Sequence, residues 1–126
     1  HVHHAAARAW FGTVGTDAWA TTPVTEAGFV RVSSNPAAVA AAVTPADAFA
    51  LLSRMRSRSG HVFFVDDVEM VVADALPPER VVTHGQVTDA HLLAVAARHL
   101  ARVATFDRGL VSLGGRRAVT LIPVAP

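Results

Sequence analysis

Residues 85–110 decide how the rest of the chain is arranged, and they read GQVTDAHLLAVAARHLARVATFDRGL. The threonine before Asp89 is a good N-cap, which places Asp89 in the first turn of a helix. Apolar residues recur at helical spacing as far as Leu100, enough to pack this helix on a sheet. The helix spans about 18 Å, and residues 102–106 return about 16 Å as a strand. The pattern therefore predicts that Asp107 lies at the edge where the helix began.

Two carboxylates at one sheet edge have a structural and a chemical interpretation. Structurally, Asp89 suits the positive end of a helix and Asp107 begins a turn. Chemically, ligands bind at the carboxyl edge of open α/β sheets, and two neighbouring acids repel each other unless a proton or a divalent cation relieves the repulsion. A third acid favours the chemical interpretation, because Glu26 follows a short strand predicted at 19–22 and begins the next predicted helix. The helix dipole alone also accounts for an acid at that position.

Three carboxylates at one edge predict a site for a hard cation. The chain has no cysteine, so disulfides and thiolate metal sites are excluded. Oxygen ligands favour Mg²⁺ or Mn²⁺, and such sites position phosphate groups and activate water for phosphodiester hydrolysis. No P-loop, GxGxxG or GxSxG pattern indicates another chemistry. Asp66 and Asp67 follow a buried strand predicted at 62–65, and they are interpreted as caps of a helix running to Leu76, with an outer ligand role as the alternative.

Length and composition indicate one globular domain. The 126 residues suffice for a single core, and 52% hydrophobic with 17% charged residues suits an α/β protein with buried strands. No apolar stretch approaches the ~20 residues of a membrane span and no cleavable signal pattern opens the chain, so we expect a cytoplasmic location. The formal charge of +1 does not by itself indicate nucleic-acid binding, but all eleven basic residues are arginine, which favours phosphate contacts. The candidate contacts, for which a solvated surface is the alternative, are Arg54, Arg58, Arg116 and Arg117.

The remaining segments alternate between predicted helices and strands. Thr44 and Pro45 mark a strong helix start, and that helix continues towards Gly60. The histidines near the start of the chain are interpreted as a solvated terminus rather than as a metal site. The alternation predicts a mostly parallel sheet with helices on both faces, in one domain over residues 1–126. The other predicted elements are a helix before residue 12 and short strands at 80–82 and 119–122.

Three segments resemble the motifs of PIN-domain ribonucleases. They read TEAGFVRV at 25–32, QVTDAHLLAVA at 86–96 and TFDRGL at 105–110, and their order and spacing match the family. The H-x-x-A-x-x-W pattern near the start of the chain matches as well. The resemblance covers nearly the whole chain and is closest to VapC-type toxins of bacterial toxin–antitoxin pairs, particularly mycobacterial ones.

The resemblance implies a three-layer α/β/α fold with a mostly parallel central sheet, and a Mg²⁺- or Mn²⁺-dependent endoribonuclease. It assigns Glu26, Asp89 and Asp107 to the catalytic metal site, with Asp89 as the principal ligand and the other two binding directly or through water. Thr105 would orient ligands, and Arg108 would help to hold the substrate. The implied partners are RNA, a VapB-type antitoxin lying across an apolar groove and the acidic site, and a second copy of the chain.

The sequence departs from the family at its start. The family begins with an apolar strand whose final aspartate binds the metal, whereas this sequence begins at His1, where the following helix is expected. We therefore expect an upstream segment that carries this strand and aspartate. The alternative is a PIN-like module that binds RNA or an antitoxin without cleavage. A phosphatase or receiver-like domain fits less well, because those folds centre on an aspartate after the first strand and need a lysine, and this sequence has neither that aspartate nor a lysine.

Overall fold

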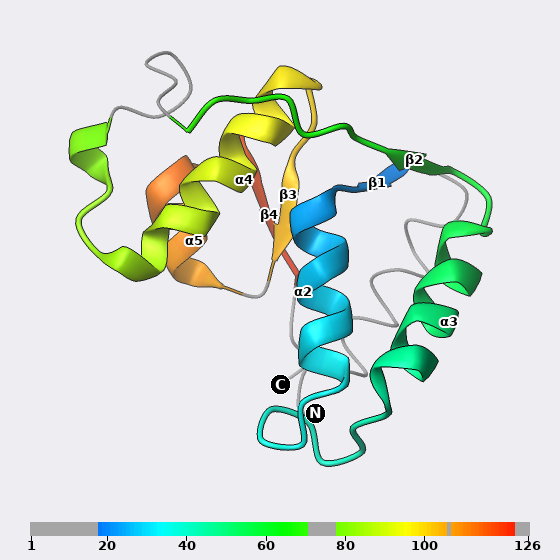
Figure 1. Ribbon diagram of the computed structural model, residues 1–126. Coiled ribbons are helices and arrows are strands. Elements are labelled where there is room, and N and C mark those ends of the chain that lie inside the picture. Colours follow the sequence, from blue (N-terminus) through cyan, green and yellow to red (C-terminus); the bar gives the residue numbers. More distant parts are fainter. Residues whose placement is uncertain (1–17, 71–77, 106, 123–126) are drawn as a thin grey trace.

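The computed structural model describes residues 18–70, 78–105 and 107–122 of the chain (Figure 1). None of the helices in these ranges is long and apolar enough to cross a membrane. In chain order the described elements are β1 (Trp19–Thr21), α2 (Pro23–Ser33), α3 (Pro45–Arg56), β2 (His61–Phe63), the 3₁₀ turns η1 (Pro78–Arg80) and η2 (His84–Gln86), α4 (Val87–Arg98), β3 (Val103–Thr105), α5 (Arg108–Gly114) and β4 (Val119–Leu121).

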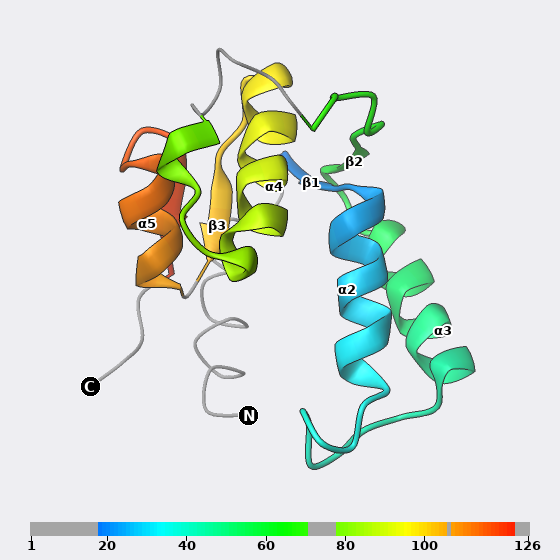
Figure 2. The ribbon, with the colours of Figure 1, turned by 60° about the vertical axis from the view of Figure 1, so that its left-hand side comes forward.

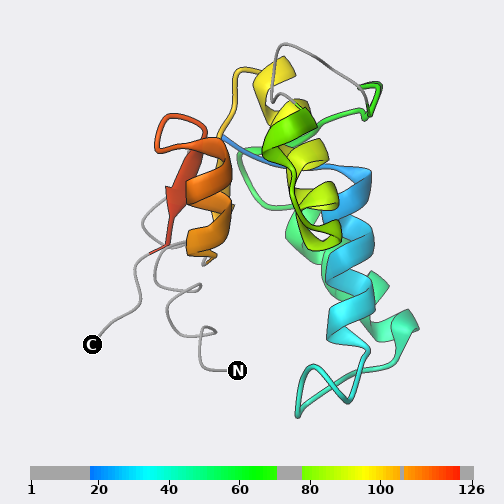
Figure 3. The ribbon, with the colours of Figure 1, turned by 90° about the vertical axis from the view of Figure 1, so that its left-hand side faces the viewer.

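The described strands pair in parallel, as predicted, and form two small sheets. β1 pairs with β2, and β3 pairs with β4. Figures 2 and 3 show α5 and β4 on one side, the α2–α3 pair on the other, and α4 between them. The α/β class and the parallel pairing are confirmed. One central sheet was predicted, whereas the described strands form two separate sheets. No described strand pairs with both β1 and β3 to join them.

The helices α2 and α3 begin at local signals in the sequence. Thr44 accepts a hydrogen bond from the Asp47 N–H (3.1 Å) and Pro45 follows as the first helical residue, so this predicted helix start is confirmed. In α2 the same pattern appears earlier than predicted. Thr22 forms a capping box with Thr25, so the helix begins directly after β1. Glu26 nevertheless lies in the first turn, as expected.

Residues 85–110 fold largely as predicted. The helix α4 begins one residue before the predicted cap, and Asp89 lies in its first turn. It ends at Arg98, after which Leu100 adopts φ 55° and turns the chain into β3. The segment after β3 was predicted as a turn, but Asp107 is the N-cap of a further helix, α5. A seven-residue helix with glycines at its start and end gives too weak a periodic signal to be recognised in the sequence.

Other predicted elements differ from the structure. The strand predicted at 80–82 is wrong, because the 3₁₀ turn η1 and irregular backbone occupy this segment. The helix predicted to run towards Gly60 ends at Arg56. The helix expected after Asp66 has not begun by residue 70, and the rest of that prediction lies outside the described residues. The predicted N-terminal helix and the terminal histidines lie outside them too.

Each half of the described structure has its own hydrophobic core. One core joins α4, β3, α5 and β4, and the other joins α2 and α3. Burying one large aliphatic side chain contributes about 1.5–3 kcal/mol, so the larger core fixes α4 against α5 most firmly. The members of the first core are Leu93, Ala96, Val103, Leu110, Leu113 and Val119, and those of the second are Val30, Ala48 and Leu52.

Candidate functional site

Asp89 and Asp107 begin two neighbouring helices that share one core. Asp89 lies in the first turn of α4, and Asp107 caps α5, which packs against α4. Burial raises the pKa of Asp89 above its usual range, and the negative charge of Asp107 raises it further. The two carboxylates are therefore close enough to interact electrostatically, as the helix–strand return predicted.

Local hydrogen bonds fix the orientation of Asp107. Its Oδ1 accepts a hydrogen bond from the Gly109 N–H (2.7 Å), which commits one carboxylate oxygen to the helix cap. Its own N–H donates to Thr105 Oγ1 (3.0 Å). Thr105 thus lies beside the last acid and orients its backbone. Arg108, predicted to bind substrate, is the exposed first residue of α5.

Glu26 lies in a different set of contacts, at the end of β1. Its Oε2 accepts a hydrogen bond from the Thr21 hydroxyl (2.5 Å), and Thr21 Oγ1 lies 2.8 Å from His61 Nε2. Its Oε1 lies 3.4 Å from Arg56 Nη1, in an ion pair. The sequence offered no signal for the contacts that His61 and Arg56 make here, because these two residues are 30 or more residues away along the chain.

The acids suit a hydrated cation better than a fully protein-enclosed one. Among the described residues, no three His, Asp or Glu side chains lie close enough together to hold one ion. The structure brings Asp89 and Asp107 together but does not add Glu26 to that group. Mg²⁺ commonly binds through only one or two carboxylates and keeps several waters. A pair of acids that repel each other, one of them partly buried, therefore fits such a cation.

Asp66 and Asp67 pair with α4 rather than with the other acids. Asp66 Oδ2 lies 2.6 Å from His91 Nε2, and Asp67 Oδ2 lies 3.2 Å from Arg98 Nη2. The hydrogen bond from His91 lowers the pKa of Asp66. These contacts fasten the segment after β2 to α4. The helix that these acids were expected to cap lies outside the described residues, so the capping interpretation stays a prediction.

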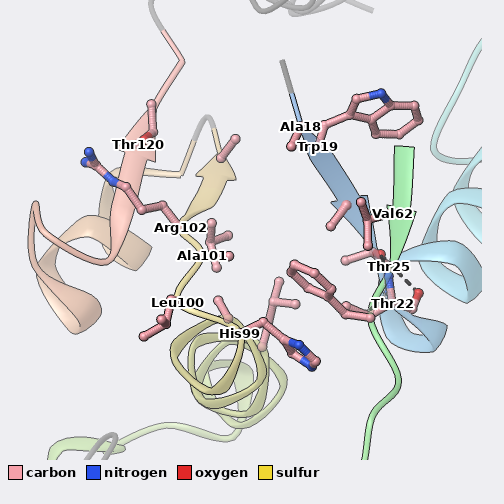
Figure 4. Close-up of a pocket in the computed structure, with 16 residues that line it drawn as sticks. Ala18, Trp19, Thr22, Thr25, Val62, His99, Leu100, Ala101, Arg102 and Thr120 are labelled. Carbon is pink, nitrogen blue, oxygen red and sulfur yellow. Dashed lines mark hydrogen bonds between the residues drawn. The ribbon is translucent and has the colours of Figure 1, made fainter. Parts of the chain in front are cut away.

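A cavity of about 670 Å³ separates the two sheets (Figure 4). It lies between β1 and β2 on one side and the C-terminal part of α4 with β3 on the other. Its lining is mainly apolar, whereas the coupled acids lie at the opposite, N-terminal end of α4. The side chains labelled in Figure 4 include Ala18, Val62, His99, Leu100, Ala101 and Thr120.

Comparison with known proteins identifies the family, although no family model matches the chain. The chain is 50% identical to Ribonuclease VapC39 of Mycobacterium tuberculosis over 110 residues, which are 87% of this chain and 79% of that protein. It is 47% identical to Ribonuclease VapC38 of the same organism over 120 residues (95% and 83% of the two chains). It is 35% identical to Ribonuclease VapC44 over 125 residues (99% and 82%). The motifs, the α/β fold with parallel strands and these identities together show that the chain belongs to the VapC family.

Proposed function

We propose that this protein is a metal-dependent endoribonuclease, the toxin of a toxin–antitoxin pair. The observation that supports this most directly is the electrostatic coupling of Asp89 and Asp107 in a chain 50% identical to a protein named a ribonuclease. In the proposal, these two acids hold a hydrated Mg²⁺ or Mn²⁺, and Glu26 contributes through water. When bound, the cation would polarise the scissile phosphate and lower the pKa of its bound water.

The residues around Asp89 and Asp107 favour the binding of a cation and of an RNA phosphate. Partial burial of Asp89 keeps its surroundings less polar than bulk water, which strengthens its attraction to a cation. The Gly109 N–H and the Thr105 hydroxyl hold Asp107 in one orientation. The first N–H groups of α4 favour negative charge, whether it belongs to Asp89 or to a phosphate of the RNA. Arg108, exposed beside Asp107, would contact the substrate in this proposal.

Replacement of Asp89 by Asn tests the proposal. Purified Asp89→Asn protein should lose metal-dependent cleavage of a fluorescently labelled RNA, because an amide binds a hard cation much more weakly than a carboxylate. We expect at least a 100-fold loss, on the order of the effect of removing a principal charge-stabilising group. Asp47→Asn is the matched control, since Asp47 is an exposed acid in the first turn of α3 and should leave cleavage unchanged. Cleavage by Asp89→Asn at the rate of the parent protein contradicts the proposal.

A binding module without catalysis is the second candidate. It is favoured by the finding that Glu26 pairs with Arg56 and does not join Asp89 and Asp107. This candidate predicts RNA binding with no cleavage at any concentration of Mg²⁺ or Mn²⁺, even with protein in excess. Cleavage that depends on Asp89 excludes it.

The proposed partners follow from the same assignment. RNA is the substrate, and a VapB-type antitoxin neutralises the protein by covering the acidic site and an apolar groove. The chain is proposed to act in the cytoplasm as a homodimer. Light scattering of the purified protein, alone and with its antitoxin, measures both associations.

A further inference from the structure

We propose that the outer face of the β1–β2 sheet is a second RNA contact, where an unpaired base stacks against the Phe63–Arg56 pair and arginines near the end of α3 meet the neighbouring phosphates. This contact lies apart from Asp89 and Asp107 and binds nucleotides beyond the cleaved bond. The inference rests on the proposed function, because it takes RNA as the ligand.

The β1–β2 sheet has one face towards the cavity and one face away from it. The strands are parallel, with Ala20 opposite Val62 and Thr21 opposite Phe63. Ala20 and Val62 line the cavity. Because alternate residues of a strand point to opposite faces, Thr21 and Phe63 lie on the outer face. Phe63 is 38% exposed there, so a ligand has access to it.

An arginine lies over the exposed ring of Phe63. The guanidinium carbon of Arg56 is 5.0 Å from the ring centroid, and 42% of the Arg56 side chain is exposed. Arg56 Nη1 lies 3.4 Å from Glu26 Oε1, and this ion pair holds the guanidinium in place. A cation–π contact by itself is a structural explanation of the pair. An exposed aromatic ring beside an arginine is also the combination on which proteins stack unpaired bases.

The surroundings of Phe63 carry an excess of positive charge. Between Asp47 and Asp66 the sequence holds three arginines and no acid. They are Arg54, Arg56 and Arg58. Glu26 pairs with one of them, and no acid pairs with Arg54 among the described residues. The end of α3 lies beside β2 (Figure 1), because residues 57–60 alone connect the two. This charge complements RNA phosphates next to a stacked base.

The neighbouring rings on the outer face are held by contacts of their own. His61 Nε2 lies 2.8 Å from Thr21 Oγ1, and the His61 ring centroid lies 4.7 Å from that of Trp19. Burial lowers the pKa of His61, the positive charge of Arg56 lowers it further, and Glu26 partly opposes both, so the ring is neutral near neutral pH. The face therefore offers fixed, uncharged rings beside cations, and fixed side chains lose little freedom when a ligand binds.

This face is distant from the acidic pair. Phe64, directly after β2, stacks on His99 with ring centroids 4.1 Å apart, so the β1–β2 sheet adjoins the C-terminal end of α4. Asp89 lies in the first turn of α4, about 15 Å along the helix from His99. A base on Phe63 therefore belongs to a nucleotide away from the cleaved bond. Such a contact contributes to the affinity for RNA and not to the chemical step.

RNA binding by the Asp89→Asn protein tests the stacking. Without added divalent cation this background keeps the RNA intact, and the probe is a fluorescein-labelled, unstructured RNA of about 12 nucleotides. Phe63→Leu removes the aromatic ring, and we expect the dissociation constant measured by fluorescence anisotropy to rise about 10-fold, the effect of losing one stacked base. Phe63→Tyr keeps a ring and should bind as the background protein does. Phe49→Leu is the matched control, because Phe49 is 61% exposed and lies about 10 Å along α3 from Arg56.

The salt dependence of the same binding tests the arginines. Arg54→Gln should reduce the slope of the logarithm of affinity against the logarithm of salt concentration by about 0.7, the contribution of one phosphate of a single strand. Arg31→Gln is the matched control and should leave the slope unchanged. Arg31 is exposed in the last turn of α2, at the end of the α2–α3 pair away from β2 (Figure 1). An unchanged slope in Arg54→Gln contradicts the phosphate contact.

Cleavage kinetics give a second readout for Phe63. In the otherwise unchanged protein, Phe63→Leu should raise KM for RNA about 10-fold and leave kcat near the parent value. The reason is that a contact away from the cleaved bond stabilises the bound substrate and the transition state equally. A fall in kcat at constant KM contradicts a role confined to binding.

The outcomes separate a failure of this inference from a failure of the proposed function. If Phe63→Leu binds and cleaves RNA as the parent does while Asp89→Asn is inactive, the stacking is wrong and the nuclease assignment stands. If Phe63→Leu weakens only the complex with the antitoxin, the outer face is a protein interface and the inference is overturned. If Phe63→Leu weakens RNA binding while Asp89→Asn cleaves as the parent does, the assignment of the nuclease site is wrong and the RNA contact stands.

Discussion

Gly114, the last residue of α5, tests how tightly the larger core holds the acidic pair. A Cβ added at Gly114 would lie 2.7 Å from Leu93 Cδ2 and 3.0 Å from Val119 Cγ2. Leu93 and Val119 are 5% and 2% exposed, so both side chains are enclosed by the core. Gly114→Ala therefore forces Leu93 out of its present position or α5 away from α4, and overpacking of this kind costs about 1–3 kcal/mol.

A gain in helix propensity offsets only part of this cost. Replacing glycine by alanine within a helix stabilises it by about 0.5–1 kcal/mol, and less at its last residue. The net effect of Gly114→Ala should be a loss of about 1–2 kcal/mol in the free energy of unfolding. For a domain of this size the melting temperature should fall by roughly 3–10 °C.

Gly28→Ala is the matched control for this prediction. Gly28 lies within α2, and a Cβ built there meets no atom of the described residues within 4 Å, apart from the backbone of its own helix. The same substitution should therefore stabilise the protein by about 0.5–1 kcal/mol. Urea denaturation followed by circular dichroism measures both variants. The packing argument is refuted if Gly114→Ala is as stable as Gly28→Ala.

The remaining predictions concern the pH dependence of two acids. Asp107→Asn removes a like charge, so the pKa of Asp89 should fall but stay above its usual range, because burial is the larger cause of the shift. A carboxyl ¹³C NMR titration measures this, and an unchanged pKa would show that the two acids do not interact. The lowered pKa of Asp66 means that the unfolded chain binds more protons than the folded protein in mildly acidic solution. The stability that Asp66 confers should be complete above its unfolded pKa of about 3.9 and disappear as the pH falls through its folded pKa. Urea denaturation from pH 6 to pH 3 should show the parent losing its advantage over Asp66→Asn, and a constant difference would contradict the role of His91.

Local sequence signals predicted the elements that begin with a clear cap. Thr44 and Pro45 specify the start of α3 by themselves, because the capping contacts lie within four residues. Asp89 lies in the first turn of α4, as predicted, although the helix begins slightly earlier. The parallel pairing of the strands follows from their alternation with helices. The motifs also indicated the family, which the relatives confirm.

The tertiary structure alone decided which partners the other acids meet. Asp66 and Asp67 have the residue type and position of capping acids, yet they pair with α4, 25 and 31 residues further along the chain. Glu26 has the same local pattern as Asp89, but its carboxylate contacts Thr21 at the end of β1 and Arg56 in α3. The periodicity of a sequence specifies which face of an element is buried, but not which distant charge that face will meet. The sequence by itself therefore determined the cap of α3, the first-turn positions of Glu26 and Asp89, and the family. The ion pairs of Glu26, Asp66 and Asp67 join segments 25 or more residues apart, which no local pattern encodes.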